Sequence, residues 1–109
     1  LAVVANTNLG TANSTTDVEL LNFLKGTYTG AKISAVAVSL TGNTQMQELV
    51  LAHSANATMN TAVITQYATV STGANVGIFT TSINSTAVAI NYRQAAANSS
   101  VKMFVQFIK

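Results

Sequence analysis

The chain has 109 residues, about one domain, and charged residues make up only 7% of it, against about 25% in an average protein. Hydrophobic residues make up 49%, and sixteen Thr and eleven Asn supply uncharged polar groups in place of charge. A free monomer normally keeps a charged surface, whereas a subunit that packs against copies of itself avoids dense like charge. The composition therefore favours an assembly subunit over a lone secreted or periplasmic β-domain.

The basic residues form no recognisable nucleic-acid-binding pattern. The net charge of +2 comes from five basic residues that are scattered along the chain without a run or stripe. Nucleic-acid binding needs several clustered contacts to phosphates. Cysteine is absent, and no apolar run approaches the ~18 residues of a membrane-spanning helix. We therefore expect no nucleic-acid partner, no disulfide and no membrane span.

Strand-forming residues dominate almost the whole chain. Thr, Val, Ile and aromatic residues are common, proline is absent, and turn signals rich in Gly, Asn and Ser recur between the apolar segments. The second of these segments could instead be a short helix, because Val18, Leu21 and Leu24 have helical spacing. In chain order, the pattern predicts eight strands at about Leu1–Leu9, Val18–Leu24, Ile33–Leu40, Gln45–His53, Ala62–Val70, Val76–Ile83, Ala87–Arg93 and Val101–Ile108.

The last predicted strand is apolar on one face and partly apolar on the other. Residues 101, 103, 105 and 107 are all apolar and alternate with the residues of the opposite face. That opposite face carries Phe104 and Ile108 beside Lys102 and Gln106. The second face is either covered within the fold, by a loop or at the centre of a sandwich, or it meets another subunit.

The arrangement of strands predicts an all-β fold. Eight short strands with regular turns and no helical crossovers favour an antiparallel β-sandwich that resembles a jelly roll. We expect residues 17–109 to form the sandwich and residues 1–16 to form an N-terminal strand or arm. This apolar segment either adds an edge strand to its own sheet or reaches a neighbouring subunit through Leu1, Val3 and Val4.

Residues that could carry catalysis or hold a metal are few. Asp17 and Glu19 would share one face of a strand, but calcium needs about six to eight oxygen ligands, so a solvated edge or a helix cap is expected there. Glu48 and His53 lie on one predicted strand at an odd separation, which points them to opposite faces. No nucleophile elbow and no phosphate-binding glycine loop is present. We expect no enzymatic activity, no catalytic residues, no metal and no cofactor.

Five strand-like segments follow one another in a fixed order. They are GAKI at 30–33, QELVLAH at 47–53, AVITQYATV at 62–70, GIFTTSI at 77–83, and a closing strand that begins with Val101 and Lys102. This order resembles a β-rich domain of tail-fibre and other virion structural proteins from marine and cyanobacterial tailed bacteriophages. The resemblance covers about Asp17 to Lys109, although Gln66 stands where that domain commonly has an acid. It implies no catalytic residues.

Composition and resemblance together predict a non-catalytic structural subunit located in a bacteriophage virion, as a tail-fibre, tail or capsid-decoration component. The expected partners are copies of itself, with a trimer as one arrangement, and other virion proteins. One alternative is an extracellular adhesin or carbohydrate-binding module, against which the absence of Trp and the presence of only three Tyr and three acids count. Another is a secreted filament held by strand exchange, with Leu1–Leu9 as the donor. The candidate interface residues are Leu1, Val3, Val4, Phe104 and Ile108.

Overall fold

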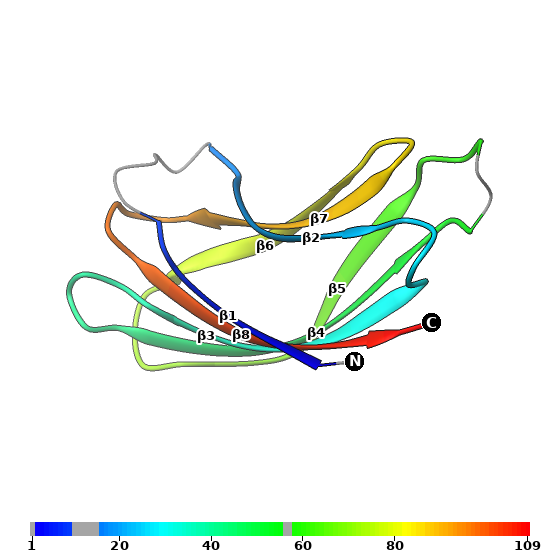
Figure 1. Cartoon of the computed structure of the whole chain (residues 1–109). Coiled ribbons are helices and arrows are strands. Elements are labelled where there is room, and N and C mark those ends of the chain that lie inside the picture. The colour runs from blue at the N-terminus through cyan, green and yellow to red at the C-terminus, as the bar shows by residue number, and fades with distance from the viewer. Residues whose placement is uncertain (1, 10–15, 56–57) are drawn as a thin grey trace.

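The computed structural model describes residues 2–9, 16–55 and 58–109, with the backbone alone for residues 2–8 (Figure 1). These residues form eight strands and no helix, so the all-β prediction is confirmed. The segment at 18–24 is a strand, and the helical alternative for it is wrong, because its backbone pairs with a neighbouring strand. The strands are β1 (Ala2–Asn8), β2 (Val18–Leu24), β3 (Gly30–Val38), β4 (Thr44–His53), β5 (Ala62–Ser71), β6 (Gly77–Ile83), β7 (Ala87–Gln94) and β8 (Ser100–Ile108).

The strands form two antiparallel sheets that pack face to face (Figure 1). One sheet has five strands in the order β1-β8-β3-β4-β5, and the other has three in the order β2-β7-β6. This arrangement confirms the predicted antiparallel β-sandwich. The chain alternates between the sheets at β1, β2 and β3, as in a jelly roll, but β3, β4 and β5 then remain together as a meander.

The N-terminal strand β1 is an edge strand of its own sheet. Its backbone pairs with β8, from Ala2 opposite Gln106 to Asn8 opposite Ser100. Of the two alternatives for this segment, the structure therefore has the one in which the strand stays with its own chain. Strand β8 consequently lies inside the sheet, between β1 and β3, and its outer face remains uncovered.

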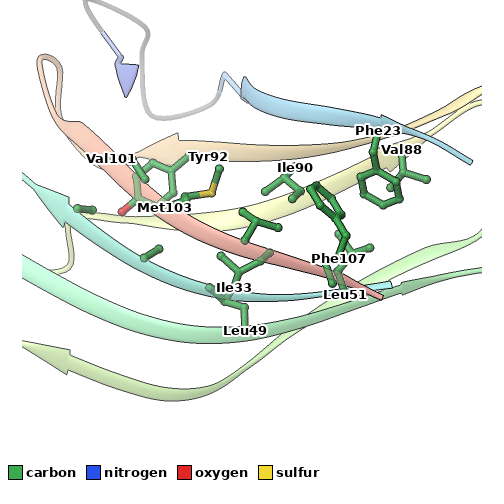
Figure 2. Packing of buried hydrophobic residues seen from close by; sticks show 14 of the residues in the cluster. Phe23, Ile33, Leu49, Leu51, Val88, Ile90, Tyr92, Val101, Met103 and Phe107 are labelled. Atoms are coloured by element: carbon green, nitrogen blue, oxygen red, sulfur yellow. The ribbon is translucent and has the colours of Figure 1, made fainter. Parts of the chain in front are cut away.

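Alternate residues of the two sheets form one hydrophobic core between them (Figure 2). On β8, residues 101, 103, 105 and 107 are buried, and the intervening positions are exposed, as the alternation predicts. At one end of the core, the rings of Phe23 and Phe107 meet edge to face with centroids 5.1 Å apart. Tyr28 stacks on Phe107 at 4.7 Å. These contacts join β2 to β8 and hold the sheets together at that end.

Gln45 of β4 joins the five-stranded sheet to the start of β6 in the other sheet. Its Nε2 donates a hydrogen bond of 3.1 Å to the carbonyl oxygen of Gly77, and its Oε1 accepts one of 2.9 Å from the backbone N–H of Val76. The side chain is almost fully buried. Both the donor and the acceptor of this buried amide are satisfied, and the two bonds hold the start of β6 against β4.

Tyr92 of β7 fills the core near the start of β6. It is fully buried, and its ring meets Phe79 edge to face at 4.7 Å. Glycine is required at position 77, because a Cβ atom there would lie 2.5 Å from Cε2 of Tyr92 and from the carbonyl oxygen of Arg93. The Tyr92 hydroxyl has no hydrogen-bond partner within the described parts of the chain. Burial raises the pKa of Tyr92 above its ordinary value of 10.0.

We expect Tyr92→Phe to raise the free energy of unfolding by about 1 kcal/mol at neutral pH, because it removes a buried hydroxyl without a partner. In the wild type above about pH 10, the unfolded state loses the phenol proton while the folded state keeps it, so stability falls as the pH rises. The variant should lose less stability over that range. Thermal unfolding from neutral to alkaline pH measures both effects. A variant that is less stable than wild type at neutral pH would contradict this prediction.

Candidate self-association surface

The two acids near the start of β2 have separate partners. Oδ1 of Asp17 lies 3.1 Å from Nε of Arg93, in an ion pair at the surface. Oε2 of Glu19 accepts a hydrogen bond of 3.0 Å from Nδ2 of Asn22. Because the segment is a strand, the helix-cap interpretation is wrong. The two carboxylates are exposed groups on the three-stranded sheet rather than a joined pair.

Glu48 and His53 lie on opposite faces of β4, as their odd separation predicts. Glu48 lies on the outer face of the sheet and accepts a hydrogen bond of 2.6 Å from Oγ of Ser34. His53 is buried on the inner side, where its Nδ1 lies 2.8 Å from the carbonyl oxygen of Ser54 and its Nε2 lies 2.5 Å from that of Tyr28. These contacts give the imidazole of His53 a structural role. They hold it on the opposite side of the sheet from the carboxylate of Glu48.

No group of three His, Cys, Asp or Glu within residues 2–9, 16–55 and 58–109 is arranged to hold a metal ion. We therefore expect EDTA to leave the melting temperature unchanged. A bound calcium ion that contributed more than about 1 kcal/mol would give a drop of more than about 5 °C on its removal. Differential scanning fluorimetry with and without EDTA, and with added calcium, makes the comparison. A drop of that size would contradict the prediction.

Large apolar side chains gather on the outer face of the five-stranded sheet. Six of them are between 39% and 72% exposed, and we refer to them as the apolar outer face. The backbone register places all of them on the side of the sheet that points away from the core. Ile108 and Val63 share one row across the sheet, and Met46 and Val70 are neighbours in another. The apolar outer face consists of Met46, Val50, Val63, Val70, Phe104 and Ile108.

The candidate interface residues divide into two groups. Phe104 and Ile108 lie on the apolar outer face, and about half of each side chain is exposed. A depression of about 240 Å³ opens beside Phe104 and Met46. The backbone of Val3 and Val4 pairs with β8, but their side chains and the whole of Leu1 lie outside the described residues. The structure therefore brings Phe104 and Ile108 to one surface, and their role as an interface stays a prediction.

Sequence reasoning missed the contributions of β4 and β5 to this surface. In β4, apolar residues occupy both faces, with Leu49 and Leu51 inside and Met46 and Val50 outside. Such a segment has no alternation that would identify an exposed apolar side. In β5, almost every residue is exposed, so the apolar ones face solvent although the segment looks like an ordinary core strand.

The size and charge of the outer face fit a contact with another protein surface. At about 4.8 Å between strands and about 3.3 Å per residue, five strands of about nine residues cover roughly 700 Å². A standard interface buries ~800 Å² on each partner. The face also carries Lys32, Lys102 and Glu48, so opposite charges are available for pairing across a contact.

The outer face of the three-stranded sheet has a different character. A depression of about 360 Å³ is lined by polar groups from Glu19, Asn22, Ser82 and Asn84, together with small or aliphatic residues. No aromatic side chain lines it. Asn84 is already engaged, because its Oδ1 accepts hydrogen bonds of 2.8 Å from the backbone N–H groups of Thr86 and Ala87. The depression therefore lacks the aromatic platform expected of a carbohydrate-binding module.

Comparison of the chain with known protein families finds none that matches. Comparison with curated proteins finds no significantly similar sequence. The resemblance to phage structural domains therefore stays a prediction. Within the described residues, no helix is long and apolar enough to cross a membrane.

Proposed function

We propose that the chain is a non-catalytic structural subunit of a bacteriophage virion, in a tail-fibre, tail or capsid-decoration position, and that it acts by self-assembly. The apolar outer face is the observation that carries the assembly part of the proposal. Exposed apolar side chains that gather on one surface, with polar residues beside them, commonly mark a contact with another protein. The virion part rests on the resemblance of residues 17–109 to phage structural domains.

The low charge of the chain supports the same proposal. With charged residues at only 7% of the chain, two copies can approach closely without strong mutual repulsion. Cyclic homo-oligomers are the usual result when identical structural parts associate, and a trimer is one such arrangement. The other virion proteins would meet the surfaces that remain free after this self-association.

The strand-exchange filament is the less favoured arrangement. A donor segment must leave its own subunit to complete the sheet of another. Here β1 pairs along its whole described length with β8 of the same chain. Donation would require this ladder to open first, whereas the apolar outer face is accessible without any rearrangement.

We expect Phe104→Ser combined with Ile108→Ser to weaken self-association by about 30- to 150-fold. Burying the exposed halves of the two side chains in an interface is worth about 2–3 kcal/mol, and each 1.4 kcal/mol is tenfold in affinity. Folding should suffer less, by about 0.5 kcal/mol per site, since each side chain lies on the outer face and is already half-exposed in the subunit. Light scattering and analytical ultracentrifugation measure the association, and thermal unfolding measures the folding.

The matched control is Ile78→Ser, since Ile78 is 44% exposed but belongs to β6 in the other sheet. It should leave association unchanged. A wild-type chain that stays monomeric at ~50 µM, a concentration above the Kd of ordinary stable interfaces, would refute self-assembly.

The virion part of the proposal has its own test. An antibody raised against the domain should label intact phage particles, and mass spectrometry of the purified particles should find the chain. Absence of the chain from the particles of the phage that encodes it, or an origin outside any phage genome, would refute this part. Self-association in solution would survive that outcome.

A further inference from the structure

Strand β5 is an edge strand with little of the usual protection against pairing. Its ten residues include no charged residue and no proline, and nearly all are exposed. It pairs with β4 on one side, and no strand within the described residues pairs with its other side. Natural proteins commonly protect such an edge with Lys, Pro, inward-pointing charge, a bulge or a covering loop. In β5, the bulge is the one such feature.

The bulge has an effect on which face each side chain of β5 occupies. The register shifts between Glu48 and Leu49 of β4, which pair with Ala68 and Gln66, so Tyr67 has no partner on β4. In a regular strand, two residues at an odd separation point to opposite faces. Because of the bulge, Val63 and Val70 instead both lie on the outer face, opposite Ala52 and Met46 of β4.

This change of face makes β5 self-complementary when two copies pair along its full length. Two copies of a strand that pair antiparallel about a two-fold axis perpendicular to the sheet must keep the same face outward. For a regular strand of ten residues paired end to end, the symmetry fails, because the facing residues belong to opposite faces. With the bulge at its centre, the outward residues of one half of β5 face the outward residues of the other half.

We infer that β5 pairs with β5 of a second copy of this chain, antiparallel and along its full length. In this register, Val63 of each copy faces Val70 of the other, and Thr65 faces Ala68. Both pairs lie on the outer face, and Ile64 faces Thr69 on the inner face. The axis passes beside Gln66 and Tyr67, where the two bulges meet.

The pairing joins the two five-stranded sheets into one sheet of ten strands and continues the apolar outer face across the axis. The exposed side chains of Val63 and Val70 then cover each other at both ends of the contact. No like charges meet along the strand, because β5 has none. The contact uses the edge of the sheet, so it does not depend on Phe104 or Ile108, and it needs only a second copy rather than a virion.

Single cysteine variants test this register, because the natural chain contains no cysteine. Facing residues of antiparallel strands have Cβ atoms about 4.5–5.5 Å apart, close to the ~3.5–4.5 Å of a disulfide. Under mild oxidation, an equimolar mixture of the Val63→Cys and Val70→Cys variants should give a cross-linked dimer. Each variant alone should not. The Thr65→Cys and Ala68→Cys variants form a second facing pair, whereas a mixture of Val63→Cys and Thr65→Cys is the control that should not cross-link.

The outcomes separate this inference from the proposed function. Cross-linking in both facing mixtures and in none of the controls supports the register, whatever the effect of the Phe104→Ser and Ile108→Ser changes on association. No cross-linking in the facing mixtures, or equal cross-linking by each variant alone, overturns it. If the facing mixtures give no cross-link and the Phe104→Ser and Ile108→Ser changes abolish association, the edge contact is refuted. The contact through the apolar outer face then stands.

Discussion

The two sheets of this sandwich differ in width, and the surface properties of the molecule follow from that difference. Three strands cannot cover five, and β5 is left with little cover, since nearly all of its residues are exposed. Every second residue of β4 is buried, from Gln45 to His53, whereas most of β5 is exposed on both faces. The hydrophobic effect cannot stabilise β5 within the single chain as it stabilises β4. Association with another copy would cover the exposed side chains of β5.

The positions of the strands could be predicted because alternation is a local property of the sequence. Each of the eight predicted strands overlaps an observed one, and β8 has the predicted buried and exposed faces. The helical spacing of Val18 and Leu21 has another cause in the structure, whereas Leu24 is exposed and does not belong to the core. The register of β2 shifts between Glu19 and Leu21, so that Val18 and Leu21 both contact the core although they are three residues apart. A bulge and a helical turn leave the same short pattern in a sequence.

The long-range relations could not be predicted, because they depend on which strands become neighbours. The exposure of Val63 and Val70 follows from the place of β5 at the edge of the sheet. In the sequence, Lys25 is one of five scattered basic residues and has no local signal for burial. In the structure it is nearly buried, and its Nζ donates a hydrogen bond of 3.0 Å to Oδ1 of Asn60 and another to the backbone carbonyl of Met59. Gln45 likewise has no local signal for its role between the sheets.

The pairing of β1 with β8 brings the two ends of the described chain together. Ala2 lies opposite Gln106, and Figure 1 shows the start of β1 and the end of β8 at the same end of the five-stranded sheet. Polypeptide joined to both ends would enter and leave the domain at neighbouring points. The domain could therefore be inserted into a surface loop of a host protein without separating the ends of that loop, or be circularly permuted through a short linker.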